Sequence, residues 1–354
     1  MDITELLNIA AKIDASDLHL VVPTRPTLRI HGRLTALERW PNLTAEMTAD
    51  VFKAISSPGQ RQDFESEREL DFAYDARGIG RFRVNASYQR GSISLVFRPI
   101  RSEIPTLDEL GLPEICKLLV ELPKGLVLIT GPSGSGKSST LAAMINCLNE
   151  NSEKKIVTIE DPIEFLYRSK KSIISQREMG SDTRSFAQGI RQALRQDPNV
   201  IMVGEMRDVE TMSAAITAAE TGHLVLSTLH TTGAPESVAR IVAAFPAAQQ
   251  ELIRTQLADV LEGVISQVLL RRADGSGRVA ALEIMLVTTP VHNLIRENKL
   301  NQLASFLETG SRVGMRTLEQ DLEKLVTTGV ITREEALAQV KQLKAPQTTA
   351  NKLA

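Results

Sequence analysis

A glycine-rich segment with one lysine offers the clearest chemistry in this sequence. Gly131-Pro132-Ser133-Gly134-Ser135-Gly136-Lys137-Ser138 matches the phosphate-binding pattern G-x-x-x-x-G-K-[ST] at every fixed position. The glycines allow backbone N–H groups to point at phosphate oxygens, Lys137 can reach the β- and γ-phosphates, and the Ser138 hydroxyl can hold Mg²⁺. The segment therefore predicts a site for ATP and magnesium, with Ser139 as a further nucleotide-binding residue.

Two later segments carry carboxylates that could complete ATP hydrolysis. The first, Thr158-Ile159-Glu160-Asp161-Pro162-Ile163-Glu164, holds three carboxylates within five residues, and like charges so close repel one another. One carboxylate can orient the attacking water while another holds the hydration shell of the metal. The second, Val200-Ile201-Met202-Val203-Gly204-Glu205, is typical of a Walker B strand, although Gly204 stands where Asp is usual. A solvated loop and a helix cap remain the structural alternatives for these two segments.

Two histidines, His223 and His230, flank a short apolar strand. They are seven residues apart, so strand alternation places their side chains on opposite faces, which argues against a shared metal. His230 would lie at the carboxyl end of the strand, which faces the nucleotide crevice in open α/β sheets. It could sense the γ-phosphate, although either histidine could equally be a buried structural residue.

The helices and strands predicted around these residues form an α/β core. An apolar strand at 125–130 precedes the P-loop and a helix at 137–149 follows it. Strands at 155–160, 199–203 and 223–228 alternate with helices at 183–194 and 208–221, which predicts a parallel sheet covered on both faces. We expect this core to span 113–289, a helical segment to span 290–344, and a flexible tail to span 345–354.

The first 99 residues follow a different pattern. Helices at 3–13, 45–56 and 59–66, strands at 17–22, 69–75, 80–88 and 92–98, and a hairpin over 28–34 predict a small α+β domain with an antiparallel sheet. The proline-punctuated segment 100–112 reads as a linker. Arg81 and Arg83 share one strand face; with Arg98 they read either as a solvated sheet face or as arginine fingers for a neighbouring subunit's triphosphate.

Composition narrows the class of protein. The chain has 354 residues, with 41 basic and 43 acidic side chains, a net charge of −2 and 4 % aromatic residues, which disfavours nucleic acid as a partner. Two cysteines cannot form a disulfide framework or a four-thiolate zinc site. An acidic start and the lack of a long apolar run lead us to expect a cytoplasmic location.

In combination, these motifs resemble those of the PilT-type retraction ATPases of the type IV pilus, within the type II/IV secretion ATPase superfamily. The resemblance covers residues 1–342. The P-loop and the segment 158–164 are similar to the family's Walker A and Asp box, and Thr221–His230 is similar to its His box. Gly204-Glu205-Met206-Arg207-Asp208 resembles its atypical Walker B, and Ser16-Asp17-Leu18-His19-Leu20 resembles its opening.

The resemblance implies a PAS-like first domain and a RecA-like core, assembled as a ring of six with each nucleotide between the two domains. It implies Glu164 as general base, Glu205 as the Walker B carboxylate that shares the magnesium with Ser138, partly through water, and His230 as the γ-phosphate contact. Further implied site residues are Glu160, Asp161, Arg207 and His223, with Arg81, Arg83 and Arg98 as triphosphate-binding arginines.

The implied function is ATP hydrolysis that pulls pilin subunits back into the inner membrane. The implied partners are five further copies of the chain, an inner-membrane platform protein and a paralogous retraction ATPase, which places the ring at the inner membrane beneath the pilus. A nucleic-acid translocase and a nucleotide-gated scaffold with little turnover are the alternatives from other classes.

One departure from the family concerns its retraction motif, Ala-Ile-Arg-Asn-Leu-Ile-Arg-Glu. Here the aligned stretch is Pro290-Val291-His292-Asn293-Leu294-Ile295-Arg296-Glu297, which keeps only the second half. We expect Leu294 to pack inward and Asn293, Arg296 and Glu297 to form an exposed coupling cluster. Stretches such as 77–84 also resemble the accessory PilU-type retraction ATPases, which remain an alternative.

Overall fold

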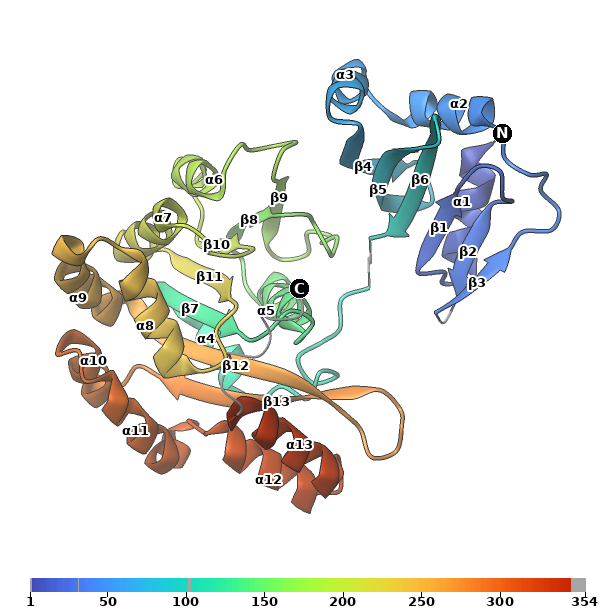
Figure 1. Cartoon of the computed structure of the whole chain (residues 1–354). Helices are drawn as coiled ribbons and strands as arrows, with labels where there is room; N and C mark the ends of the chain where they lie inside the picture. Colours follow the sequence, from blue (N-terminus) through green and yellow to red (C-terminus); the bar gives the residue numbers. More distant parts are fainter. Residues whose placement is uncertain (1, 31, 101–102, 345–354) are drawn as a thin grey trace. The chain divides into compact units, whose positions relative to one another are not determined.

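The chain folds as two compact units. The computed structural model describes residues 2–30, 32–100 and 103–344. The first unit spans Met1–Glu103 and the second spans Ile104–Ala354, so the division falls inside the segment predicted as a linker. Figure 1 shows the helices and strands of both units. The predicted tail, 345–354, lies outside the described residues.

The first unit is built on a six-stranded antiparallel sheet in the order β3-β2-β1-β6-β5-β4. Side chains alternate along its long strand β5, where Phe82, Val84 and Ala86 are buried against the apolar sides of the helices. This arrangement confirms the predicted small α+β domain. Its strands are β1 (Asp17–Leu20), β2 (Thr27–Ile30), β3 (Arg33–Ala36), β4 (Glu69–Ala76), β5 (Gly80–Gln89) and β6 (Ser92–Pro99), and its helices are α1 (Ile3–Lys12), α2 (Ala45–Ile55) and α3 (Pro58–Glu67).

The second unit is built on a seven-stranded sheet in the order β13-β12-β7-β11-β10-β8-β9. Its strands are β7 (Gly125–Thr130), β8 (Lys155–Glu160), β9 (Ile173–Glu178), β10 (Val200–Val203), β11 (Leu224–Leu229), β12 (Leu261–Arg271) and β13 (Arg278–Leu286). The helices between them are α4 (Ile115–Glu121), α5 (Lys137–Asn151), α6 (Phe186–Ala193), α7 (Val209–Glu220), α8 (Ala234–Ala244), the 3-10 helix η1 (Ala247–Gln249) and α9 (Gln250–Val260).

Helices cover both faces of this sheet, as the sequence predicts. Leu126 and Leu128 of β7 pack with α6 to α9 on one face, whereas Val127 and Ile129 pack with α4 and α5 on the other. All side chains of β7, β10 and β11 are buried, which accounts for their continuous apolar runs. The carboxyl ends of these strands therefore meet at one edge of a rigid, fully buried layer.

The sheet is mixed, which corrects the expectation of a parallel sheet. Six strands run parallel, but β13 pairs antiparallel with β12 through a hairpin. The structure also contains three strands that the sequence pattern does not predict: β9, β12 and β13. Strand β9 is an edge strand whose side chains are mostly half-exposed, so it lacks the apolar run that reveals a central strand.

Helices follow the sheet, as expected from residue 290 onward. They are α10 (Thr289–Arg296), η2 (Leu300–Gln302), α11 (Leu303–Thr309), η3 (Gly310–Val313), α12 (Leu318–Thr327) and α13 (Arg333–Lys344). Helices α12 and α13 pack on the β12–β13 hairpin (Figure 1), through a small core that includes Val268, Leu322 and Ile331. Among the described residues, none of the helices combines the length and the apolar character that crossing a bilayer requires.

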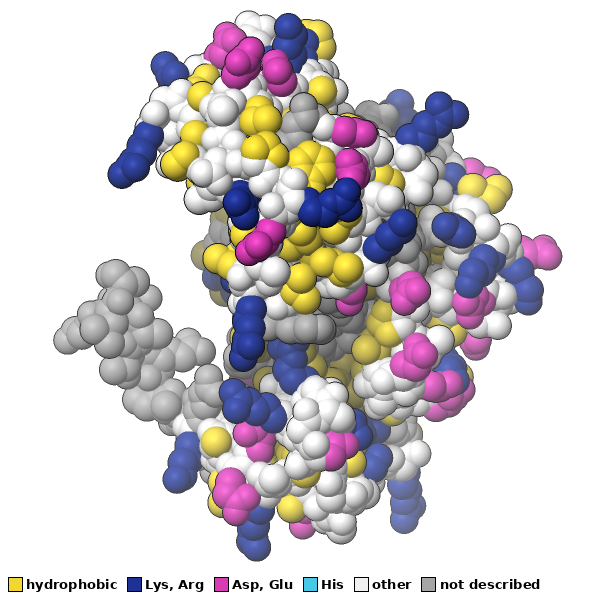
Figure 2. Space-filling view, turned by 90° about the vertical axis from the view of Figure 1, so that its right-hand side faces the viewer, with side chains coloured by type: hydrophobic (Ala, Val, Ile, Leu, Met, Phe, Trp, Pro, Cys, Tyr) yellow, Lys and Arg dark blue, Asp and Glu magenta, His cyan; other side chains and the backbone are white. Residues whose placement is uncertain are grey.

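The surface carries mixed charge. On the face drawn in Figure 2, Lys and Arg side chains lie interspersed with Asp and Glu side chains. This mixture accords with the small net charge of −2.

Candidate nucleotide-binding site

The P-loop, residues 131–136, links the end of β7 to the start of α5. Gly131, Gly134 and Gly136 all adopt positive φ angles, of 141°, 77° and 91°, which L side chains rarely adopt. At Gly131 a Cβ would also lie only 2.3 Å from the carbonyl oxygen of Gln267. The fixed glycines of the motif are thus required by backbone shape and close approach, as expected of a phosphate-binding loop.

Lys137 places its ammonium group in the mouth of this loop. Its Nζ donates hydrogen bonds to the carbonyl oxygens of Gly131, at 2.8 Å, and Pro132, at 3.0 Å, and the residue is only 9 % exposed. Burial lowers the pKa of Lys137, whereas Glu205 and Glu164 raise it. A buried cation held only by neutral carbonyls and more distant carboxylates is well prepared to bind an anion.

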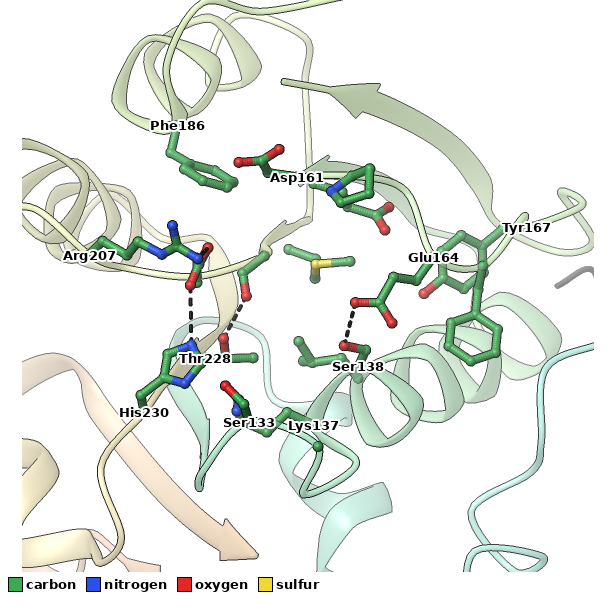
Figure 3. A pocket seen from close by; sticks show the side chains of 18 residues that line it. Ser133, Lys137, Ser138, Asp161, Glu164, Tyr167, Phe186, Arg207, Thr228 and His230 are labelled. Atoms are coloured by element: carbon green, nitrogen blue, oxygen red, sulfur yellow. Dashed lines mark hydrogen bonds and ion pairs between the residues drawn. The ribbon is translucent and has the colours of Figure 1, made fainter. Parts of the chain in front are cut away.

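The carboxylate loop, residues 160–167, leaves the end of β8 and faces the P-loop. The Ser138 hydroxyl donates a 2.9 Å hydrogen bond to Oε1 of Glu164, so the two predicted site residues meet directly (Figure 3). Asp161 is exposed and lines the same pocket. Glu164 is therefore the carboxylate of this loop that contacts Ser138, whose hydroxyl the sequence predicts as a magnesium ligand.

Glu160 has a different environment from the other two carboxylates of the loop. It is 7 % exposed, and its Oε1 accepts hydrogen bonds from Thr158 Oγ1, at 2.7 Å, and Gln176 Nε2, at 3.1 Å. Burial raises its pKa to about 7, although the hydrogen bonds from Thr158, Gln176 and the backbone of Glu164 act to lower it. The repulsion that the sequence predicts is thus relieved by burying one carboxyl where it accepts two hydrogen bonds.

Gln176 of the edge strand β9 fixes the carboxylate loop, and the sequence analysis missed it. Its Oε1 accepts from the backbone N–H of Tyr167, at 2.9 Å, and its Nε2 donates to the carbonyl of Phe165, at 2.8 Å, as well as to Glu160. No motif marks this residue, because its role depends on the pairing of β9 with β8.

Glu205, the predicted Walker B carboxylate, lies two residues beyond β10 and is 9 % exposed. Its Oε1 forms a 2.7 Å ion pair with Arg207, and its Oε2 lies 3.3 Å from Nε2 of His230. Figure 3 shows Arg207 and His230 on one side of the pocket and Ser138 with Glu164 on the other. The structure therefore brings Glu205, Arg207 and His230 into one cluster, as the sequence proposes.

His223 does not join this site. It lies just before β11, whereas His230 lies just after it, so the two rings occupy opposite ends of the strand. Nδ1 of His223 is 3.0 Å from the carbonyl oxygen of Ala218 and 3.2 Å from Oγ1 of Thr221, which joins the end of α7 to the strand. These contacts connect the His223 ring to the end of α7, which is consistent with a structural role.

The pocket between these groups has a volume of about 270 Å³. Besides the predicted residues it is lined by apolar and aromatic side chains that the sequence analysis did not single out, because they look like ordinary core residues: Leu141, Phe165, Tyr167, Phe186 and Met202. Gly136, Ser139, Thr140 and Gln267 line a second hollow on the other side of the P-loop.

The predicted arginines of the first unit lie on its sheet and are paired with carboxylates there. Arg98 donates from Nε to Oδ1 of the buried Asp17 at 2.9 Å. Arg81 lies 3.4 Å from Asp75, Arg83 lies 3.6 Å from Asp71, and Arg83 and Arg98 are direct cross-strand neighbours. The three guanidinium groups thus come from one face of two adjacent strands.

Helix α10 carries the remnant of the retraction motif. Leu294 is buried and Asn293, Arg296 and Glu297 are exposed, which confirms the predicted orientation. Pro290 is the second residue of the helix. His292, which stands where the family has Arg, places Nε2 2.9 Å from Oδ1 of Asp259 at the end of α9.

Comparison with known proteins identifies the family. A family model described as "Type II/IV secretion system protein" matches residues 82–338. The chain is 48 % identical to the type IV pilus retraction ATPase PilT of Pseudomonas aeruginosa, over 96 % of this chain and 98 % of that protein. It is 41 % identical to the type IV pilus ATPase PilU of the same organism, over 96 % of this chain and 88 % of that protein.

A solved structure of the pilus retraction motor PilT with bound ADP matches the fold with a TM-score of 0.89, at 46 % identity and with 96 % of each chain covered. The match includes residues of both units. The chain belongs to the type II/IV secretion system protein family and, within it, to the PilT-type pilus retraction ATPases.

Proposed function

We propose that the chain hydrolyses MgATP at the pocket between the P-loop and the carboxylate loop and that this drives type IV pilus retraction. The observation that carries the proposal is the convergence of Lys137, Ser138, Glu164, Glu205 and His230 on one pocket. These groups come from four separate segments, which a merely structural glycine turn would not require.

The residues present fit a magnesium nucleotide. Magnesium prefers oxygen ligands and takes phosphate oxygens and water for most of its coordination. The Ser138 hydroxyl, with Glu164 2.9 Å away, offers oxygen beside the P-loop, and Glu205 offers a second, mostly buried carboxylate. Bound there, the ion would neutralise charge on the phosphates.

Each side chain then has a distinct role. Lys137 stabilises charge on the β- and γ-phosphates, and Glu164 accepts a proton from the attacking water. Glu205 would help to hold the magnesium, partly through water, and His230, whose Nε2 lies 3.3 Å from Oε2 of Glu205, would contact the γ-phosphate.

The active assembly in this proposal is a ring of six chains. Arg81, Arg83 and Arg98 reach a nucleotide of a neighbouring subunit and exchange their aspartate partners for phosphate oxygens. ATPase activity per chain should then rise with protein concentration in step with hexamer formation. Arg83→Ala should lower turnover in the assembled ring, and flat activity across the assembly range would remove the reason to assign these arginines to a neighbour.

The working partner is an inner-membrane platform protein of the pilus machine, which would hold the ring at the membrane. A strain that lacks the chain tests this role. The account expects excess surface pili and no twitching, restored by the wild-type gene and not by Lys137→Ala. A deletion strain with normal retraction under standard load would favour an accessory, PilU-like role, which the 41 % identity to PilU keeps as the second candidate.

The exposed cluster on α10 provides the test of force transmission. Arg296→Ala changes a surface residue remote from the pocket, so ATPase activity and assembly should stay within about twofold of wild type. Twitching should nevertheless fail. Normal twitching in this variant would show that the altered first half of the motif has freed the protein from this coupling.

A further inference from the structure

Gln267 of β12 lies against the P-loop, and the nucleotide chemistry above does not use it. It is 1 % exposed. Its neighbour Ser266 pairs with Thr130, the last residue of β7, so Gln267 lies directly beside the first residue of the loop. Because its carbonyl oxygen would lie 2.3 Å from a Cβ on Gly131, its backbone already limits the path of the loop.

The side-chain amide of Gln267 bridges the P-loop and the first turn of α5. Nε2 donates a 2.6 Å hydrogen bond to the carbonyl of Ser135, within the loop, and Oε1 accepts a 2.9 Å hydrogen bond from Thr140, in the first turn of α5. Lys137 lies between these two contacts in the chain. One rigid amide therefore fixes the loop and the helix start relative to each other.

Removing the side-chain amide of Gln267 would mainly destabilise the conformation of the P-loop. Ser135 and Thr140 are both buried, so neither the carbonyl nor the hydroxyl could readily turn to water. A buried polar group left without its partner destabilises the conformation that buries it. The loop would then shift away from the shape in which its N–H groups converge on phosphate, and binding would have to restore that shape.

We propose that Gln267 is a positioning residue that holds the P-loop in its phosphate-binding shape and so sets the affinity of the site for nucleotide. The inference rests on nucleotide binding at the P-loop, as proposed above, and is independent of pilus retraction. Through these hydrogen bonds, Gln267 also connects the P-loop to the β12–β13 hairpin, on which α12 and α13 pack.

Calorimetric binding of ADP to the full chain tests the proposal. Gln267→Met keeps the size of the side chain but removes both hydrogen bonds, and should weaken ADP binding about tenfold, the effect of roughly one lost hydrogen bond. Gln249→Met, on an exposed glutamine, is the matched control and should bind as wild type does. A wild-type chain that binds no ADP would count against the proposed function, whereas Gln267→Met that binds as tightly as wild type would overturn this inference alone.

Gln267→Glu supplies a readout that a purely structural role would not move. A buried carboxyl has a raised pKa, and when protonated it can still donate to Ser135 and accept from Thr140. When ionised it would place negative charge against the Ser135 carbonyl. Its ADP affinity, relative to wild type at each pH, should therefore be near normal at pH 5.5 and at least about tenfold weaker at pH 8.5.

Thr140→Val is a second variant for the same ADP-binding measurement, and it replaces Gln267→Met if that variant does not fold. It removes one of the two hydrogen bonds, and in the double variant with Gln267→Met its effect on ADP affinity should largely disappear. Additive effects of the two substitutions, or a Gln267→Glu variant whose affinity follows the wild-type pH profile, would show that Gln267 supports the fold without setting the shape of the loop.

Discussion

The P-loop and the carboxylate loop both leave the carboxyl ends of buried strands in one sheet, but they are held in different ways. The P-loop follows β7, which has β12 and β11 as neighbours, and its shape depends on glycines with positive φ angles and on Gln267. The carboxylate loop follows β8, beside the edge strand β9, and depends on side-chain hydrogen bonds from Gln176. In the proposed function, the loop at the centre of the sheet binds the phosphates and the loop near its edge positions the general base, Glu164.

The largest expected effect comes from the P-loop. Lys137→Ala removes the cation that binds the β- and γ-phosphates and should lower ATP turnover by about 10³-fold or more, because both binding and transition-state stabilisation are lost. A phosphate-release assay measures this. Lys171→Ala changes an exposed lysine of the same unit and should stay within twofold of wild type; near-normal turnover in Lys137→Ala would refute the assignment of the P-loop.

The carboxylate loop should show the next largest effect. Glu164→Gln keeps the size of the side chain but removes the base, so kcat should fall by about 10²-fold. The measurement is kcat under saturating ATP. Asp161→Asn, on the exposed carboxylate of the same loop, is the matched comparison and should cost less; equal losses would mean that the loop needs its total charge rather than one base.

A substitution of Gln176 tests whether the edge strand β9 positions the proposed general base, Glu164. Gln176→Met should lower kcat by about tenfold and leave the KM for ATP nearly unchanged, since a small displacement of Glu164 impairs chemistry more than binding. Steady-state kinetics separate the two constants. Gln188→Met, on the exposed side of α6, is the control. A raised KM with normal kcat would show that the carboxylate loop, like the P-loop, contributes to nucleotide binding.

The smallest effect concerns pH and stability. Burial raises the pKa of Glu160 to about 7, whereas a glutamate in an unfolded chain titrates near pH 4.3. Between these values the folded protein binds more protons than the unfolded chain, so this residue's contribution to stability is lost as pH rises through about 7. The free energy of unfolding should therefore fall less between pH 5 and pH 8 in Glu160→Gln than in wild type.

Urea titrations at the two pH values check this difference, with Glu153→Gln, on an exposed glutamate, as the control. Burial also raises the pKa of Glu283 to about 7, but that residue is present in both proteins and cancels in the comparison. Identical pH dependence in wild type and Glu160→Gln would contradict the burial of Glu160 as a partly protonated acid.

The two loops also differ in how far their sequence reveals them. The P-loop could be predicted because its backbone shape demands glycine at fixed positions, and the positions of Glu164, Glu205 and His230 followed from strands that end in one crevice. Gln176 and Gln267 could not, because a glutamine carries no pattern of its own and acts through strands far away in the chain. Strand β9 is polar, so its place beside β8 becomes visible only once the sheet is assembled.

His223 and His230 belong to one motif but lie at different places in the fold. A motif that includes two histidines suggests that both serve the site, but the length of β11 separates them. Likewise, strand alternation places Arg81 and Arg83 on one strand face, but the position of Arg98 beside Arg83 depends on a cross-strand register that no local pattern specifies. The aspartate partners of all three depend on contacts of the same kind.

The central claim is that the P-loop binds the nucleotide and the carboxylate loop catalyses its hydrolysis. The most direct test is the ATP affinity of Lys137→Ala and Glu164→Gln, measured side by side under conditions that prevent turnover. The account predicts that Glu164→Gln binds ATP within about twofold of wild type, while Lys137→Ala binds at least about tenfold more weakly. An equal loss of affinity in both variants would contradict it, because the carboxylate loop would then hold the nucleotide and not only act on it.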